Sequence, residues 1–199
     1  MEKIRICFAS NNEHKLDEVR AILPANFELL SLKDIGCNEE LPENQRSLEG
    51  NALEKAAFVH RKFGIDCFAD DTGLETEALH GAPGVDTAHY AGPERDAHKN
   101  MELLLRNLGD SENRRACFRT VFCLFWQGEV YSFEGRAEGS ISRNIRGSGG
   151  FGYDPVFIPN GYSQTFAELG PEEKNRFSHR AAACRRLAEF LQLAGKSAF

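Results

Sequence analysis

The chain has 199 residues, a net charge of -6 and 41% hydrophobic residues, among them 15 Phe. This composition excludes a disordered chain, and the length favours a single domain over residues 1–199 with two lobes, where a cleft between the lobes would bind the ligand. The acidic balance excludes a broad basic surface of the kind that follows nucleic-acid backbones, so no nucleic-acid partner is expected.

The cysteines and the hydropathy pattern indicate where the protein works. None of the cysteines forms a C-x-x-C pair, and several lie in apolar runs, so reduced thiols in a core are expected. The apolar stretch near the N-terminus is too short for a signal peptide, and no later stretch is long enough for a membrane span. We therefore expect a cytoplasmic protein with no membrane partner. The cysteines are Cys7, Cys37, Cys67, Cys117, Cys123 and Cys184.

The first elements have an α/β order. Alternating apolar residues predict a strand over residues 4–8, and Asn11 or Asn12 can then cap a helix that ends before Pro24. The later predicted elements are an apolar stretch at 27–32, a helix at 47–63, a strand at 67–69, a turn at 80–84, a helix at 96–108, a hairpin that runs from 116 to 133 and turns at Gln127-Gly128, a strand at 156–158, a short helix begun by Gly170-Pro171, and a helix at 178–194. This order predicts the α/β class, with a mixed central sheet flanked by helices.

Lys15 lies in the first turn of the first predicted helix. A cation there opposes the positive end of the helix dipole, and a bound anion would relieve the mismatch. Ser10 and Asn12 offer donors beside the helix N–H groups, which is how helix starts hold phosphate. A solvated lysine is the commoner arrangement, so this pattern does not decide the matter by itself.

Asp70 and Asp71 directly follow an apolar strand, the place where α/β folds gather ligands. Adjacent residues on an extended backbone point to opposite faces, so one of the two can face a site while the other supports it. An acidic turn after a strand is an equally good interpretation of these residues alone. Glu43 is a plausible second carboxylate, because Mg²⁺ binds one or two carboxylates and completes its shell with water and substrate oxygens.

The run that contains Gly147, Gly149 and Gly152 has the spacing G-x-G-x-x-G, but a strand follows it instead of a helix. This excludes the dinucleotide fingerprint. The loop can still approach a ligand closely, and Phe151 and Tyr153 are candidate stacking faces on it.

Four further side chains complete the pattern of charged groups. Asp154 follows the glycine loop and is a candidate reader of a base edge. His179 and Arg180 open the terminal helix, and Lys174 lies shortly before them, so cations again stand at the positive end of a dipole. Each of these residues alone is better explained as a solvated group, but the repetition of such clusters in an acidic protein favours an anion site.

The chain resembles the inosine triphosphate pyrophosphatase family, whose members hydrolyse dITP and XTP. The resemblance covers nearly the whole chain, and several separated motifs occur in the right order. These motifs are Phe8-Ala-Ser-Asn-Asn-Glu-His-Lys15, Leu41-Pro-Glu43 with Asn51-Ala52, Ala69-Asp-Asp-Thr-Gly-Leu74 with Gly81-Ala-Pro-Gly84, Gly149-Gly-Phe-Gly-Tyr-Asp-Pro155, and Glu173-Lys174 with Ser178-His-Arg180.

The resemblance implies the roles of individual residues. Glu43 and Asp71 would bind Mg²⁺, and Asp71 would accept the proton, with Asp70 as the other catalytic candidate. Lys15 and Lys174 would hold phosphates. Phe151 would stack on the purine, and its 6-keto edge would be read by Asp154, His179 and Arg180. The full set of expected nucleotide contacts is Ser10, Asn11, Asn12, Lys15, Thr72, Phe151, Gly152, Tyr153, Asp154, Lys174, His179 and Arg180.

The resemblance also implies the reaction: a metal-activated water attacks the α-phosphorus of a noncanonical purine triphosphate (dITP, ITP or XTP), and pyrophosphate leaves. A homodimer is implied as well. One departure is His89, which stands where the family often has arginine. Two alternatives remain, a related pyrophosphatase for other modified nucleotides and a noncatalytic nucleotide-binding module.

Overall fold

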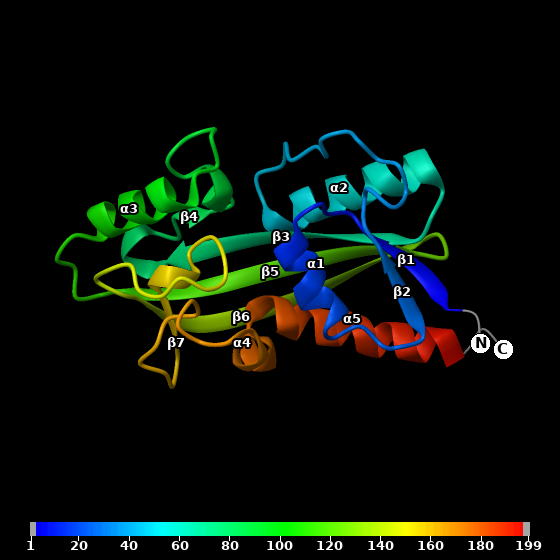
Figure 1. Ribbon diagram of the computed structural model, residues 1–199. Coiled ribbons are helices and arrows are strands. Elements are labelled where there is room, and N and C mark those ends of the chain that lie inside the picture. The colour runs from blue at the N-terminus through cyan, green and yellow to red at the C-terminus, as the bar shows by residue number, and fades with distance from the viewer. Residues whose placement is uncertain (1–2, 197–199) are drawn as a thin grey trace. The chain divides into compact units, whose positions relative to one another are not determined.

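The computed structural model describes residues 3–196, which form two compact units (Figure 1). Unit 1 comprises Met1–Asp71, Thr120–Gly135 and Arg180–Phe199, and unit 2 comprises Thr72–Arg119 and Arg136–His179. That both units act as a single domain stays a prediction.

A mixed sheet of seven strands runs through the chain in the order β2-β1-β3-β5-β6-β7, with β4 paired to β3. β1 is parallel to β2 and β3, whereas β4 and β7 are antiparallel to their neighbours. The predicted α/β class with a mixed sheet is therefore confirmed. The strands are β1 Ile4–Phe8, β2 Phe27–Leu30, β3 Cys67–Thr76, β4 Pro83–Gly84, β5 Arg115–Trp126, β6 Glu129–Ile141 and β7 Phe157–Pro159.

The predicted helices form, and three begin at the side-chain caps that their sequences offer. The Asn12 side chain accepts a hydrogen bond from the Lys15 N–H, and Ser47 and Asp96 cap the next two α-helices in the same way. The α-helices are α1 Glu13–Arg20, α2 Leu48–Phe63, α3 Ala97–Leu108, α4 Pro171–Phe177 and α5 His179–Lys196. Short 3₁₀ helices lie at Glu77–Leu79, Thr87–His89 and Asp154–Val156.

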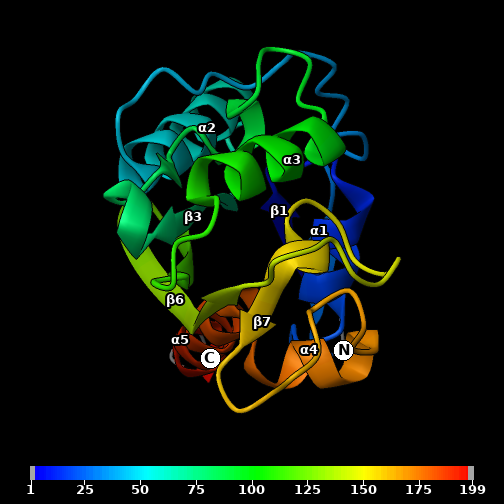
Figure 2. The same cartoon turned by 90° about the vertical axis from the view of Figure 1, so that its left-hand side faces the viewer.

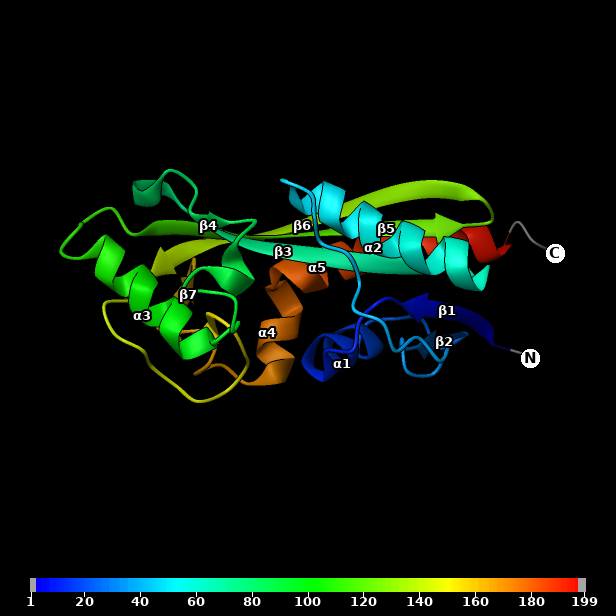
Figure 3. The ribbon, with the colours of Figure 1, turned by 90° about the horizontal axis from the view of Figure 1, so that it is seen from above.

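In unit 1, β1 and the first part of β3 are buried on both faces. Successive side chains of a strand point to opposite sides, so Phe8 and Phe68 pack toward α1 and α5, whereas Cys7 and Cys67 pack toward α2. The rings of Phe8 and Phe68 stack with centroids 4.7 Å apart. Figures 1 and 3 show α2 on one face of these strands and α5 on the other. This layering gives residues 70 and 71, at the end of the same strand segment, different surroundings.

Unit 2 has its own core. Leucines of α3 pack with Phe118 of β5, Phe157 of β7 and Phe166 of the loop that follows β7. Figure 2 shows α3, β7 and α4 of this unit on the side turned to the viewer. The core holds the loop between β6 and β7, which carries the glycine-rich motif.

Several boundaries differ from the sequence prediction: the hairpin expected to end at 133 continues to Ile141, for example, and two of the differences concern the predicted site residues. The strand expected at residues 67–69 continues to Thr76, so the interpretation of Asp70 and Asp71 as an acidic turn is wrong. The carboxylates stay on extended backbone because each finds polar partners on its own face. The helix expected from residue 178 begins at His179, and Ser178 separates it from α4.

The expectation of reduced core cysteines is confirmed, since all six thiols are free and buried. Burial raises the pKa of Cys7 and Cys67 to about 12 and that of Cys117 to about 11. Because the thiolate is the reactive form, we expect Ellman's reagent to leave the native chain unmodified at pH 8 and to modify all six thiols in denaturant. Rapid modification of the native chain would contradict this burial.

Among residues 3–196, no helix combines the length and the apolar character that a membrane crossing requires.

Candidate active site

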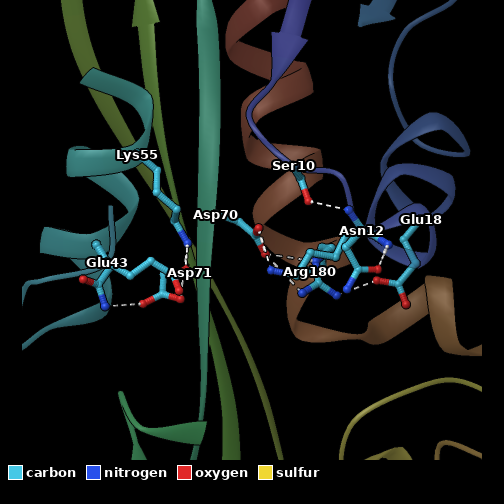
Figure 4. A network of polar contacts seen from close by, with 10 residues as sticks. Ser10, Asn12, Glu18, Glu43, Lys55, Asp70, Asp71 and Arg180 are labelled. Carbon is cyan, nitrogen blue, oxygen red and sulfur yellow. Dashed lines mark hydrogen bonds and ion pairs between the residues drawn. The ribbon is translucent and has the colours of Figure 1, made fainter. Parts of the chain in front are cut away.

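Strand β3 places Asp70 and Asp71 on opposite faces, each in its own cluster of polar side chains (Figure 4). Asp70 lies on the side of α1 and α5, and Asp71 on the side of α2. All the residues that contact them below belong to unit 1. The alternation expected from the sequence is therefore present.

Asp70 is the centre of a buried ion network, with a side chain only 2% exposed. The Lys15 Nζ donates to its Oδ1 at 2.8 Å, and the Arg180 Nε and Nη2 donate to its Oδ2 at 3.3 and 3.1 Å. The Nη1 of Arg180 donates to Glu18 Oε2 at 2.6 Å. Residues from the two ends of the chain thus meet on one carboxylate.

Burial of Asp70 by itself favours its neutral form, but the charges of Lys15, Arg180 and Lys55 outweigh burial and hold its pKa below the usual value. Burial lowers the pKa of Lys15, and Asp70 opposes that change. Arg180 is also buried, yet its two carboxylate partners raise its pKa. Asp70 is consequently a fixed negative charge, which suits holding cations better than accepting a proton.

The residues predicted to bind phosphate at the start of α1 form a side-chain cap on this helix. The Ser10 Oγ accepts from the Asn12 N–H at 3.2 Å, and the Asn12 Oδ1 accepts from the Lys15 N–H at 3.3 Å. Asn11 and Asn12 are exposed. Lys15 extends from this helix start to Asp70, and phosphate binding by these residues stays a prediction.

Asp71 lies in a second cluster, with a side chain 14% exposed. The Lys55 Nζ donates to Glu43 Oε1 at 2.5 Å and lies 3.6 Å from Asp71 Oδ1. The Asn51 Nδ2 donates to Asp71 Oδ2 at 3.0 Å. The structure thus brings together Glu43 and Asp71, the two predicted metal ligands.

The pKa values of the two carboxyl groups of β3 are shifted in opposite directions. Burial raises the pKa of Asp71 above its usual value, although Lys55 and the hydrogen bond from Asn51 oppose this change. Burial disfavours the charged form of Lys55, but Asp71, Asp70 and Glu43 together raise its pKa. A carboxylate with a raised pKa is the better proton acceptor, so the geometry favours Asp71 over Asp70 for that role.

The chemistry of the donors fits a divalent cation. Carboxylate oxygens of Glu43 and Asp71 converge on the Lys55 ammonium, so a positive charge already occupies the space they share. Mg²⁺ typically binds one or two carboxylates and keeps water in its other positions. Over residues 3–196 no group of three or more His, Cys, Asp or Glu side chains could hold a metal ion.

In unit 2 a second set of predicted residues meets. The Lys174 Nζ donates to Asp154 Oδ2 at 2.7 Å and lies 4.9 Å from the centre of the Phe151 ring. The same Oδ2 accepts from the Phe151 N–H at 2.9 Å. A Cβ on Gly150, whose φ is +68°, would stand 2.0 Å from that oxygen, so only glycine lets the loop close on Asp154.

The other predicted residues of unit 2 have differing surroundings. His179 is buried and stacks on Phe118, with centroids 4.5 Å apart. Thr72 is half-buried on β3, and Gly152 lies in the glycine loop with φ +60°. The expectation that the Tyr153 ring offers a stacking face is wrong, because this ring packs in the core and its hydroxyl donates to Thr87 O. His89 is exposed in a 3₁₀ helix.

Three residues of these clusters were given no role from the sequence: Glu18, Lys55 and Asn51, the last of which was noted only as part of a family motif. A signal for each is helical spacing. Glu18 lies three residues after Lys15, and Lys55 lies four residues after Asn51, so each pair shares one helix face. Lys55 also interrupts the apolar face of α2, where it is 6% exposed.

These features define an α/β protein with a carboxylate and lysine site on β3, together with a lysine, aspartate and phenylalanine cluster in unit 2. The chain matches the model of the Ham1 family over residues 6–190 and therefore belongs to the Ham1 family. The family resemblance found in the sequence is confirmed.

Relatives support the assignment along the full length. The chain is 53% identical to the dITP/XTP pyrophosphatase of Porphyromonas gingivalis, covering 96% of this chain and 98% of that protein. It is 49% identical to the dITP/XTP pyrophosphatase of Flavobacterium psychrophilum, covering 95% and 100%. The structure of the Staphylococcus aureus Ham1 protein matches with a TM-score of 0.87 and 34% identity, covering 96% of this chain and 99% of that one.

Proposed function

We propose that this protein is a nucleoside triphosphate pyrophosphatase that hydrolyses dITP, ITP and XTP to the monophosphate and pyrophosphate. The observation that carries the proposal is full-length membership of the Ham1 family, with relatives named dITP/XTP pyrophosphatase. Removal of these nucleotides would prevent their incorporation into DNA and RNA. The paired carboxylates and buried lysines of unit 1 are the chemistry that this reaction needs.

In the proposed mechanism the groups around β3 act on the phosphates. Asp71 accepts the proton of the attacking water, since burial makes it the more basic of the two aspartates. Lys15 and Lys55 neutralise charge that develops on the phosphate oxygens. Glu43 and Asp71 would hold Mg²⁺, which supplies Lewis-acid activation when it is bound. Pyrophosphate leaves as one unit, and no covalent intermediate is needed.

The proposed base contacts belong to the second cluster and to α5. Phe151 stacks on the purine, and Asp154, His179 and Arg180 read its 6-keto edge. Lys174, whose ammonium is already held against Asp154 and Phe151, contacts the nucleotide from α4. A site built around donors to a carbonyl oxygen disfavours the 6-amino group of ATP, because that group leaves the donors unpaired.

The test is release of pyrophosphate from ITP and from ATP under identical conditions, with product identified as the monophosphate. Selective hydrolysis of ITP supports the proposal. Preference for a modified pyrimidine or for a 7-methylguanine nucleotide would favour a related pyrophosphatase. Binding without turnover of any nucleotide would favour a noncatalytic module.

We also expect an absolute requirement for a divalent cation, with Mg²⁺ as the proposed ion. Two oxygen ligands at Glu43 and Asp71 hold such an ion only together with the substrate phosphates. Removal of divalent cations with excess EDTA should abolish pyrophosphate release from ITP, and added Mg²⁺ should restore it. Full turnover in the chelator would contradict the metal-assisted mechanism.

The remaining expectations concern the surroundings of the enzyme. We propose a cytoplasmic homodimer whose partner molecules are small nucleoside triphosphates, with no nucleic-acid or membrane partner. Light scattering coupled to size exclusion would distinguish a dimer from the 22.2 kDa monomer.

A further inference from the structure

Both polar atoms of the Asn51 side-chain amide form hydrogen bonds. Its Oδ1 accepts from the Gln45 backbone N–H at 2.9 Å, and its Nδ2 donates to Asp71 Oδ2 at 3.0 Å. The side chain lies in the first turn of α2 and is 5% exposed. One buried amide therefore joins the segment before α2 to the carboxylate on β3.

The orientation of this amide is fixed by its partners. The backbone N–H of Gln45 can only donate, so it requires the oxygen of Asn51, and this leaves the NH₂ group to donate to Asp71. Asparagine is a poorer helix former than alanine. The hydrogen bonds of its side chain, and not helix propensity, therefore explain asparagine at position 51.

Gln45 lies two residues after Glu43, so Asn51 restrains the segment that carries the other carboxylate. Glu54, one turn further along α2, restrains the same segment, since its Oε2 accepts from the Asn44 N–H at 2.8 Å. Only Asn51, however, also holds Asp71. Glu54 therefore provides a natural comparison for separating the two effects.

Asn51 also divides the two oxygens of Asp71 between different partners. Oδ2 receives the hydrogen bond from Asn51, and Oδ1 faces Lys55 at 3.6 Å. Loss of the hydrogen bond from Asn51 would therefore remove a contact that sets the orientation of the carboxylate from the side opposite Lys55.

We propose that Asn51 is a positioning residue that sets the orientation of the Asp71 carboxylate relative to the Glu43 segment. This inference rests on the proposed function, because it assigns Asn51 to the same reaction. Asn51 acts through Asp71, so its removal should lower kcat with little change in KM for ITP.

The test compares Asn51→Asp with Glu54→Gln in the full chain at saturating Mg²⁺. Asn51→Asp keeps an acceptor for the Gln45 N–H but removes the donor to Asp71 and adds a like charge, and an acidic residue in the first helical turn is electrostatically favourable for the fold. We expect kcat to fall on the order of 10- to 100-fold, the range for a lost hydrogen bond to a charged group. Glu54→Gln should stay within about twofold of wild type.

A second readout uses the backbone amide of Gln45, followed by NMR without nucleotide. Its hydrogen-bonded chemical shift should persist in Asn51→Asp and be lost in Asn51→Ala, while kcat falls in both variants. Loss of kcat in Asn51→Ala alone would show that Asn51 only holds the segment, and would overturn the inference. An Asn51→Asp kcat close to that of an active wild type would overturn it as well, whereas a wild type without pyrophosphate release would overturn the proposed function itself.

Discussion

Replacement of Asp71 by Asn should lower kcat for ITP by roughly 10²- to 10⁴-fold, the usual contribution of a positioned acid–base group. Asparagine keeps the size of the side chain but cannot take up a proton and binds a divalent cation more weakly. KM should change less, because the other predicted phosphate ligands remain. Steady-state release of pyrophosphate at saturating Mg²⁺ measures both constants.

Asp96→Asn is the matched control for this change. Asp96 caps α3 through hydrogen bonds from the N–H groups of His98 and Lys99, and asparagine caps helices equally well. The control should therefore retain wild-type kcat. An unchanged kcat in Asp71→Asn would remove Asp71 from the mechanism and make Asp70 the candidate base, in spite of the cations that hold its pKa down.

Local features of the fold could be predicted from the sequence because their causes are local. The caps at Asn12, Ser47 and Asp96 each require only a side-chain oxygen and an N–H two or three residues later. The opposite orientation of Asp70 and Asp71 follows from the geometry of extended backbone alone. For the same reason the glycine loop could be separated from a dinucleotide motif by the proline and strand that follow it.

The lengths of elements were less predictable where partners far along the chain stabilise them. β3 continues past Ala69 because Lys15 and Arg180 neutralise Asp70 while Asn51 and Lys55 hold Asp71. The residues that directly follow Ala69 are Asp-Asp-Thr-Gly, and this local sequence favours a turn.

Sequence spacing likewise could not predict which residues form each polar cluster. Lys15 and Arg180 were each recognised as cations at helix starts, which suggested bound anions. In the structure both cations form ion pairs with the carboxylate of Asp70, and Arg180 also pairs with Glu18. Electrostatic mismatch with a helix dipole singled out both cations, but it did not identify Asp70 and Glu18 as the charges that they pair with.

Arg180→Met should destabilise the fold by about 3 kcal/mol, because it removes the buried guanidinium that pairs with the carboxylates of Asp70 and Glu18. Chemical unfolding at pH 7 measures this change. Arg176→Met is the control: Arg176 is also paired with a glutamate, but its side chain is 75% exposed, so its loss should change stability little.

The destabilisation should depend on pH with a defined sign. The native pKa of Asp70 is below its unfolded value, so its charge stabilises the wild type above about pH 4 and this contribution is lost as the pH falls through the native pKa. In Arg180→Met the pKa of Asp70 rises because one of its two cationic partners is lost, so protonation removes the buried charge at a higher pH than in the wild type. The difference between wild type and variant should therefore be largest near neutral pH and shrink in acid, and a difference independent of pH would contradict the charge pairing.

The same residue should affect the choice of base. If Arg180 donates to the purine 6-oxygen in addition to its contacts with Asp70 and Glu18, Arg180→Ala should lower kcat/KM for ITP about 10- to 100-fold, since charge-assisted hydrogen bonds contribute roughly 1.5–3 kcal/mol. ATP presents an amino group at that position and should lose much less, so the ratio of kcat/KM for ITP to that for ATP should collapse. Both values are measured at a temperature where circular dichroism shows the variant to be folded. An unchanged ratio would refute base reading, because a residue that acts only by holding Asp70 must slow both nucleotides equally.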